Sequence, residues 1–168
     1  YLNRGILAPK LIQYVQDRDL WRFELDFTKE VMTYVFAHDF DFDVWDELAS
    51  ELLNDIGGVI SSGSVLLMKQ RKDIDAVLKQ TKRTMWIGGY QVPAANVPYF
   101  MSSDAGHILC ENKPFAACYS DTETHRLFSL RSSDEGEDVA LIAAQYGGGG
   151  HRNAAGFKVE RKHPLAML

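Results

Sequence analysis

Residues 146–157 of the sequence, YGGGGHRNAAGF, set four consecutive glycines directly before a histidine and an arginine. Two alanines and a fifth glycine follow within the same stretch. Glycine loses more backbone freedom on folding than other residues, at a cost of about 0.5–1 kcal/mol each relative to alanine in regular structure. The run therefore indicates a place where the backbone turns sharply or comes close to a ligand.

The residues around the run favour an anion site. Gly147 is expected to end the helix that precedes it, so the other glycines need a different reason. Successive N–H groups in such a turn form an anion-binding nest, and the histidine and arginine add a ring N–H and a guanidinium fork for phosphate oxygens. A flexible surface turn is the alternative for a bare glycine run, but the flanking pattern favours the anion site. The expected phosphate ligands are Gly148, Gly149, Gly150, His151 and Arg152.

Two other phosphate motifs are excluded. A P-loop requires Lys-Ser or Lys-Thr after the glycines, and neither dipeptide is present there. A dinucleotide-binding fingerprint follows a strand, whereas this run follows a predicted helix.

Composition bounds the class of protein. The chain has 168 residues, of which 46% are hydrophobic and 24% charged, as in ordinary globular proteins. Two cysteines, Cys110 and Cys118, suggest neither a disulfide framework nor a thiolate zinc site, which favours a reducing cytoplasm. No apolar run approaches the roughly 18 residues that cross a bilayer, so we expect no membrane partner. The sequence opens on Tyr1, and we expect a piece of a longer protein.

Charge differs between the two parts of the chain. Residues 1–60 hold 12 acidic and 5 basic side chains, whereas residues 61–168 hold 11 and 13. The change of sign indicates two units. A globally basic nucleic-acid binder is excluded, but a few aimed donors still suffice for a local phosphate site.

Hydrophobic spacing predicts an α/β chain in which a helical segment precedes a small mixed sheet. Three helices are expected within residues 9–53, followed by a longer connector helix over 61–83. The expected elements beyond it are a strand ended by Pro93, a short helix from near Pro98, a hairpin of strands 115–119 and 127–131, a helix over 138–146 started by a capping box of Asp134 and Glu137, and a strand over 156–159.

Two motifs resemble a known family. The run GGGH at 148–151, followed by AAG at 154–156, resembles the GGGHxxAAG signature of the DHH-associated domain. That domain is the substrate-binding, C-terminal part of DHH-family phosphoesterases, which include RecJ-like single-strand exonucleases, oligoribonucleases and cyclic-dinucleotide phosphodiesterases. FSLRS at 128–132, with Asp138 and Val139 after it, resembles a run in a bacterial subgroup. The resemblance covers residues 85–160 and extends to YVQDRDLW at 14–21, which is similar to the end of the catalytic domain.

The resemblance implies a domain plan and a cofactor. Residues 1–60 are then the helical C-terminal remnant of a DHH catalytic domain, 61–84 a connector helix, and 85–168 the DHH-associated substrate-binding domain. The family's catalytic domain holds two manganese ions through aspartates and an Asp-His-His motif and hydrolyses phosphoesters with metal-activated water. This sequence contains no Asp-His-His motif, so we expect the chain alone to be inactive and a catalytic domain in cis to supply most of the metal site.

Roles for three further residues follow from the resemblance. Arg131, which alternates to the face opposite Phe128 and Leu130, is implied to lie near the phosphate or base of the substrate. Asp17 or Asp19 is implied to match the last metal-binding aspartate of the family. The alternative for this pair is a solvated helix end.

Two functions remain open at this point. The first is the substrate-binding portion of a metal-dependent phosphoesterase whose ligand is a short single-stranded nucleic acid or a nucleotide. The second is a non-catalytic RNA-binding module, similar to the domain attached to alanyl-transfer-RNA synthetases. Trp86, Tyr90 and Tyr99 are candidates either for base stacking or for core packing. Apolar surface on the first helices also favours self-association into a homodimer.

Overall fold

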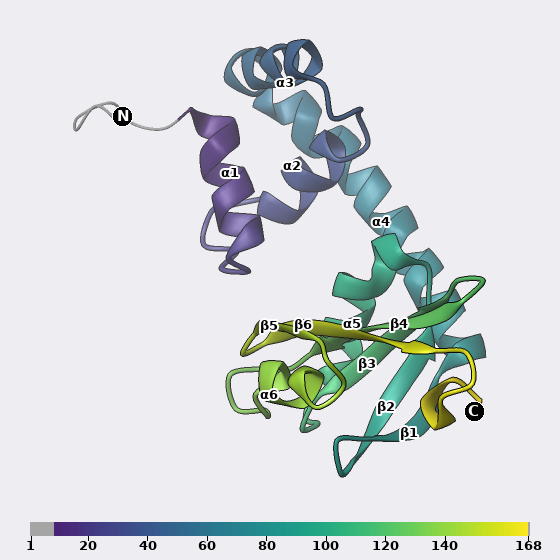
Figure 1. Cartoon of the computed structure of the whole chain (residues 1–168). Helices are drawn as coiled ribbons and strands as arrows, with labels where there is room; N and C mark the ends of the chain where they lie inside the picture. Colours follow the sequence, from purple (N-terminus) through teal and green to yellow (C-terminus); the bar gives the residue numbers. More distant parts are fainter. Residues whose placement is uncertain (1–8, 168) are drawn as a thin grey trace. The chain divides into compact units, whose positions relative to one another are not determined.

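The computed structural model describes residues 9–167, which divide into two compact units, one up to Lys72 and the other from Asp73 (Figure 1). The first unit is helical, as the sequence predicts. No helix of the described residues is long and apolar enough to cross a membrane. The helices of the first unit are α1 (Lys10–Asp19), α2 (Thr28–Val35), α3 (Phe42–Asn54) and the greater part of α4 (Ile56–Thr81).

The core of the first unit lies among these helices. It consists of side chains that repeat every three or four residues, so that each helix turns one apolar stripe inward. Asp41 is the N-cap of helix α3, and its carboxylate accepts a hydrogen bond from the backbone N–H of Asp43 at 2.9 Å. The buried side chains are Leu11, Tyr14, Val31, Met32, Val35, Leu48, Leu52 and Val59.

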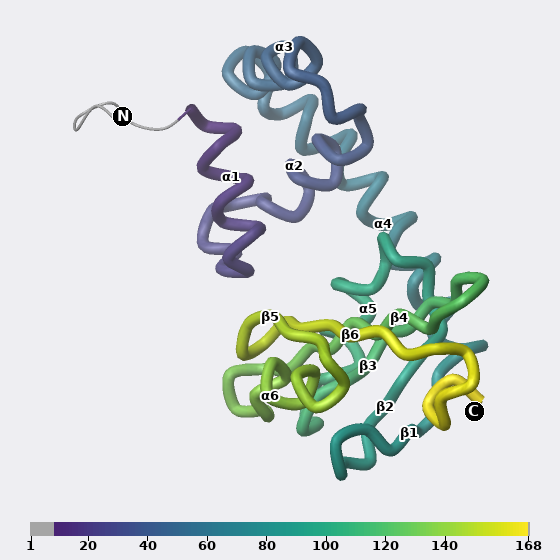
Figure 2. The backbone as a smooth tube through the Cα atoms, viewed as in Figure 1, coloured from purple at the N-terminus to yellow at the C-terminus, as the bar shows by residue number. Residues whose placement is uncertain are grey.

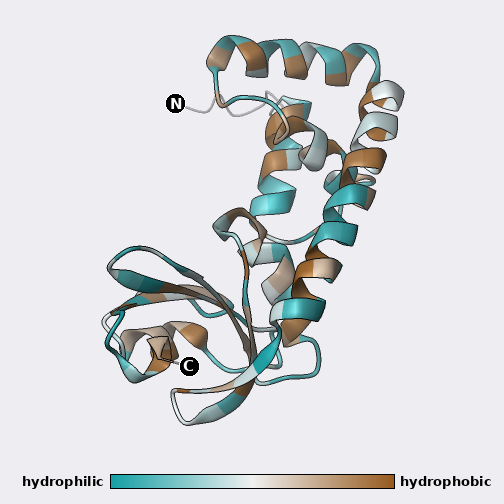
Figure 3. Cartoon of the chain, turned by 90° about the vertical axis from the view of Figure 1, so that its right-hand side faces the viewer, coloured by the Kyte–Doolittle hydropathy of each residue, from teal (hydrophilic) through white to brown (hydrophobic). Residues whose placement is uncertain are grey.

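Helix α4 begins five residues earlier than the connector helix predicted for 61–84, and it ends at Thr81 because strand β1 starts at Arg83. Its early start depends on Asp55, whose carboxylate accepts the N–H of Gly58 at 2.9 Å. A Cβ on Gly58 would lie 2.3 Å from that carboxylate, so the glycine makes the cap sterically feasible. Figure 3 shows apolar and polar residues alternating along this helix.

The second unit contains a six-stranded mixed sheet, which confirms the predicted α/β fold. The strand order is β1-β2-β3-β4-β6-β5, in which β2 and β3 are parallel and all other neighbours are antiparallel. The strands are β1 (Arg83–Ile87), β2 (Tyr90–Asn96), β3 (Ala116–Asp121), β4 (His125–Arg131), β5 (Gly149–His151) and β6 (Ala154–Glu160). The helices are η1 (Tyr99–Met101), α5 (Ser102–Cys110), α6 (Val139–Ala144) and η2 (Pro164–Ala166).

The prediction of a single strand ended by Pro93 is wrong. The segment forms a hairpin of β1 and β2 about Gly88 and Gly89, which have φ angles of 59° and 86°. Pro93 lies inside β2, opposite Thr84. It fits there because the ladder between β2 and β3 begins only at the next residue, Ala94.

The predicted capping box of α6 is also wrong. Asp138 caps the helix instead, with its carboxylate accepting the N–H of Ala140 at 2.9 Å. The two residues predicted for the cap have other partners. Asp134 accepts a hydrogen bond from the Asn153 amide. Glu137 accepts a hydrogen bond from the Tyr90 hydroxyl, and this bond raises the pKa of Tyr90.

The sheet packs a different core on each face. One core joins α6 and η2 to the sheet, and the other joins α5 and the last turns of α4 to it. Successive side chains of β3 therefore point to opposite faces of the sheet, so that Ala117 lies in the first core and Cys118 in the second. The second face of β4, β6 and β5 carries a cleft rather than a full helical cover.

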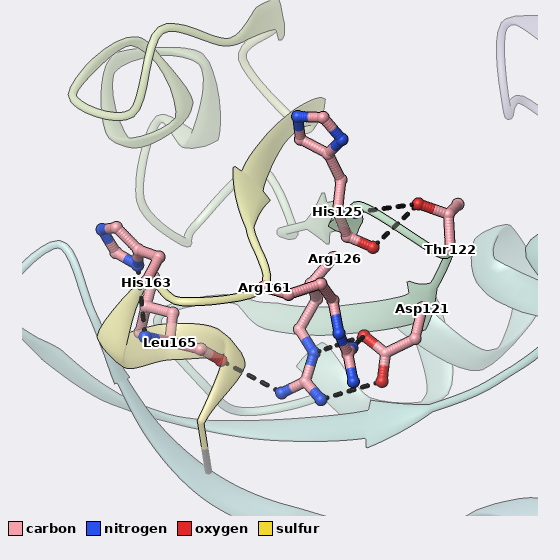
Figure 4. Close-up of polar contacts among 7 residues, drawn as sticks. All are labelled: Asp121, Thr122, His125, Arg126, Arg161, His163 and Leu165. Carbon is pink, nitrogen blue, oxygen red and sulfur yellow. Dashed lines mark hydrogen bonds and ion pairs between the residues drawn. The ribbon is translucent and has the colours of Figure 1, made fainter.

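A buried arginine ties the β3–β4 hairpin to the end of the chain (Figure 4). Arg126 is 5% exposed and donates from Nε and Nη2 to the two carboxylate oxygens of Asp121, at 2.7 and 2.9 Å. Its Nη1 donates to the carbonyl of Leu165 at 3.0 Å. Arg161 pairs with the same carboxylate. The hydrogen bond from Arg126 is the largest cause that lowers the pKa of Asp121 to about 2.

Asp121→Asn is expected to lower the free energy of unfolding of the second unit by about 2 kcal/mol at pH 7, because it leaves the buried guanidinium without its anion. The folded pKa of Asp121 lies below its ordinary value of 3.8, so the stabilisation is present above about pH 4 and is lost as the pH falls toward 2. Urea unfolding followed by the β3 and β4 amide signals measures this difference. A difference between the wild type and the variant that stays constant from pH 7 to pH 2 would contradict the assignment.

Candidate functional site

The glycine run follows the C-terminus of α6 and continues into the edge strand β5, as the backbone trace in Figure 2 shows. Gly147 has a φ of 75° and donates to the carbonyl of Ala144 at 3.1 Å, while Gly148 donates to that of Ala143 at 3.0 Å. These two bonds are those of a Schellman motif. The prediction that Gly147 ends the helix is therefore confirmed.

Contacts inside the protein explain why two positions of the run are glycine. A Cβ on Gly148 would lie 2.1 Å from the carbonyl oxygen of Gly156, and one on Gly150 would lie 2.5 Å from the backbone of Ala155. Gly150 also has a φ of 148°. Both residues are glycine because β6 packs directly against them.

No internal contact of this kind explains Gly149. A Cβ at this position would have no atom of the described residues within 4 Å, and its φ is not positive. Gly149 nevertheless lines the cleft, so an added methyl group would extend into open space there. Within the described residues, neither packing nor backbone conformation requires a glycine at this position.

The cleft has a volume of about 560 Å³, within the range of small-molecule sites. Residues that pair across neighbouring strands share a face of the sheet, so the register gives the layout of its floor. Cys118, Ser129, Gly156 and Gly149 form one cross-strand row from β3 to β5. All four line the cleft, and all are small.

A cation borders each side of this row. Arg131 pairs with Ala154 on one side, and Leu127 pairs with Lys158 on the other. Each of these four residues also lines the cleft. Ser129 and Lys158 were not predicted from the sequence. Their signal was the alternation along β4 and β6, but the site emerges only when the two strands are set in register.

Arg131 lies where the sequence predicts, on the face opposite Phe128 and Leu130. Its Nη1 donates to the Leu130 carbonyl at 2.8 Å. A Cβ on Gly106 of α5 would lie 2.7 Å from Cγ of Arg131, so this glycine makes room for the stem of the arginine. Helix α5 thereby helps to hold the guanidinium side chain at the cleft.

His151 and Arg152 differ in their placement. His151 is exposed and pairs with Ala154, which also pairs with Arg131, so the histidine and this arginine share one face two strands apart, at roughly 10 Å between backbones. Neither His151 nor Arg152 lines the cleft itself. Arg152 donates from Nη2 to the carbonyls of Asp134 and Gly136, each at 3.1 Å, and thereby holds the turn before α6.

Cys118 belongs to the floor but is fully buried. Burial raises the pKa of its thiol to about 12, although the nearby charge of Arg131 opposes the shift. A thiol that stays protonated is a poor nucleophile, and Cys118 is a packed member of the second core.

Asp17 and Asp19, implied as metal ligands, lie at the end of α1 in different surroundings. Asp17 is 6% exposed and accepts hydrogen bonds from the N–H groups of Glu24 (2.9 Å) and Leu25 (3.2 Å) and from Thr28 Oγ1 (2.5 Å). Burial alone would raise its pKa, but these bonds outweigh burial and lower the pKa of Asp17.

Asp19 is exposed, and Arg18 between the two lies over the Trp21 ring, 4.7 Å from its centroid. Within residues 9–167 no three histidine, cysteine, aspartate or glutamate side chains lie together as a metal-binding group. The carboxylate of Asp17 is engaged with three donors of its own loop, and the described residues by themselves do not fit a complete manganese centre.

The glycines offer a stability test. Gly148→Ala and Gly150→Ala are each expected to lower the free energy of unfolding by about 1–3 kcal/mol, because the new methyl group meets β6 backbone. Gly149→Ala is expected to stay within about 0.5 kcal/mol of the wild type. Thermal unfolding of the three variants measures the order. Equal losses at Gly149 and Gly150 would contradict the packing described here.

Asp17 offers a second test, with Asp19 as its matched control. Asp17→Asn is expected to lower the unfolding midpoint of the first unit because the amide accepts fewer of the three hydrogen bonds. Asp19→Asn is expected to leave it unchanged. Since the folded pKa of Asp17 is lowered, its stabilisation is present above the ordinary carboxylate pKa and lost as the pH falls through the lowered value. An Asp17→Asn midpoint that equals the wild type at pH 7 would refute the structural role.

Comparison with known proteins gives one sequence relative. Uncharacterized protein R106 of Acanthamoeba polyphaga mimivirus is 35% identical over an alignment of 157 residues that covers 89% of this chain. The alignment covers 37% of that protein, so the chain spans just over a third of the length of this curated relative. No protein-family model matches the chain.

Solved structures show the fold more widely. A pGpG-specific phosphodiesterase, PggH from Vibrio cholerae, has a TM-score of 0.55 at 11% identity, over 89% of this chain and 60% of its own. The DHH domain of a member of a ribosomal-protein family has a TM-score of 0.51 at 13% identity, over 91% and 42%. By fold, the chain therefore groups with structures that include a phosphodiesterase and a DHH domain.

Proposed function

We propose that the second unit is the substrate-binding domain of a DHH-type phosphoesterase, and that its cleft holds a phosphate group of a nucleotide or of a short single-stranded nucleic acid. The observation that carries this proposal is Gly149. It lines the cleft together with Arg131, and no contact with a residue in the described range 9–167 requires a glycine there. A bound ligand supplies the missing reason.

The chemistry of the cleft suits phosphate. A missing Cβ at Gly149 lets a phosphate oxygen approach the backbone of the run on the edge strand, beyond Gly147 and Gly148, whose N–H groups already donate to α6. Arg131 offers a planar fork of donors and remains charged at every physiological pH. His151 and Lys158 lie on the same face and add positive charge or a ring N–H at its margins. Arg152, held by the turn before α6, acts through the position of that turn.

In this proposal binding and hydrolysis are divided. The described residues do not fit a manganese centre, and the sequence lacks the Asp-His-His motif. The curated relative is nearly three times as long as the stretch that matches. We therefore assign the metal ions and the activated water to a catalytic domain in cis, and substrate binding to this chain. The buried free cysteines Cys110 and Cys118 suit a reducing cytoplasm.

The test is a titration of the chain, labelled with nitrogen-15, with a short 5′-phosphorylated single-stranded oligonucleotide. Saturable shifts of the amide signals from Gly148 to His151 are expected, and they weaken as salt rises, because phosphate contacts release counterions. The same oligonucleotide without the 5′-phosphate is expected to bind more weakly.

Variants make the test specific. Gly149→Ala, which should fold normally, and Arg131→Ala are each expected to weaken binding about tenfold, the size expected for loss of a charge-assisted contact. Arg71→Ala removes the same charge from the exposed surface of α4 and is expected to bind as the wild type does. Unchanged binding by Gly149→Ala would refute the proposal. Binding without hydrolysis by the longer protein would instead favour the RNA-binding module.

A further inference from the structure

Tyr99 lines the cleft while 76% of it remains exposed. The two other aromatic residues considered for stacking are placed differently. Tyr90 is partly buried and meets Phe115 edge-on at 5.7 Å, and Trp86 is 64% exposed on β1 but does not line the cleft. Of these three, Tyr99 alone combines an open ring with a place in the site.

The backbone that carries Tyr99 is firmly anchored. Val97 donates its N–H to the Tyr119 carbonyl of β3 at 3.0 Å, which extends the sheet to the residue before Pro98. The Ser102 hydroxyl donates to the Tyr99 carbonyl at 2.7 Å, and the Met101 N–H donates to the Pro98 carbonyl at 2.9 Å. A ring that is exposed on an ordered turn costs little further entropy when a ligand covers it.

Tyr99 and the glycine run belong to opposite sides of the cleft. Tyr99 follows β2, next to β3, whereas Gly149 lies on the edge strand β5. The floor between Cys118 of β3 and Gly149 spans three strand spacings, or roughly 14 Å. Its small residues Ser129 and Gly156 leave this path open. A phosphate at the run would place the rest of an extended ligand along the path toward Tyr99.

We propose that Tyr99 is the stacking surface for a base of a short single strand whose 5′-phosphate lies at the glycine run. This inference rests on the proposed function and deepens it, because it assigns the residue that receives a base of the extended ligand. An aromatic face attracts any base, so Tyr99 adds affinity with little base preference. Phosphate recognition stays with Gly149 and Arg131, and base recognition is added at the far end.

The experiment compares two probes, a 5′-phosphorylated adenosine dinucleotide and the same dinucleotide without its second base, by calorimetry and NMR on the full chain. The wild type is expected to bind the complete dinucleotide about tenfold more tightly than the probe that lacks the base. Tyr99→Ala is expected to remove that preference and leave binding of the probe without the base unchanged, while Tyr99→Phe keeps the preference because the ring remains. The H8 proton of the second base is expected to shift upfield on the wild type but not on Tyr99→Ala.

Phe100→Ala is the matched control, since Phe100 is equally exposed, at 76%, but does not line the cleft. It is expected to bind both probes as the wild type does. Equal affinity for the two probes, unchanged by Tyr99→Ala, overturns the inference and leaves the phosphate site standing, provided that Arg131→Ala weakens both. If neither of the two probes binds, the proposed function is overturned, and this inference with it.

Discussion

The second unit depends on one close approach, between the backbone of residues 148–150 and that of β6. A side chain on Gly148 would collide with the Gly156 carbonyl, and a side chain on Gly150 would collide with Ala155. The rings of Tyr146 and Phe157 stack at 4.5 Å, and Phe157 stacks on Phe128 at 4.6 Å, so aromatic packing holds the start of the run against β6 and β4. Because the run is fixed in this way, β5 extends the sheet and the row of small residues becomes a continuous floor.

In the first unit, a single carboxylate organises the loop after α1. Trp21, Phe23 and Phe27 all have φ angles between 53° and 63°, a region that costs aromatic residues roughly 1–3 kcal/mol each. Asp17 offsets this strain by accepting the N–H groups of the loop and the Thr28 hydroxyl. The aspartate that the family resemblance implies as a metal ligand is thus, within this chain, the fixed centre of a strained loop.

Sequence patterns predicted the helices of the first unit and the β3–β4 hairpin because each shows a clear period within a short stretch. They missed the start of α4, which depends on how the Asp55 side chain turns back, and the β1–β2 hairpin, which contains a proline at a place where proline is usually excluded.

Of the residues that line the cleft, sequence patterns singled out Gly149 and Arg131 but not Ser129 or Lys158. Those two residues join the cleft only through the pairing of β4 with β6, which lie 23 residues or more apart along the chain and are matched by no local signal. The same limit applies to Arg152, whose side chain is used by a turn 16 to 18 residues away.

The chain order of the strands has a consequence for how the protein is made. Strand β6 comes after the other described strands in the sequence, yet it lies between β4 and β5, and Leu165 beyond it supplies an acceptor to the buried Arg126. Synthesis from the N-terminus therefore leaves the apolar face of β4 and the charge of Arg126 uncovered until β6 and Leu165 emerge. The segments that form the helices of the first unit are synthesised much earlier. During translation the second unit therefore needs more protection by chaperones than the first.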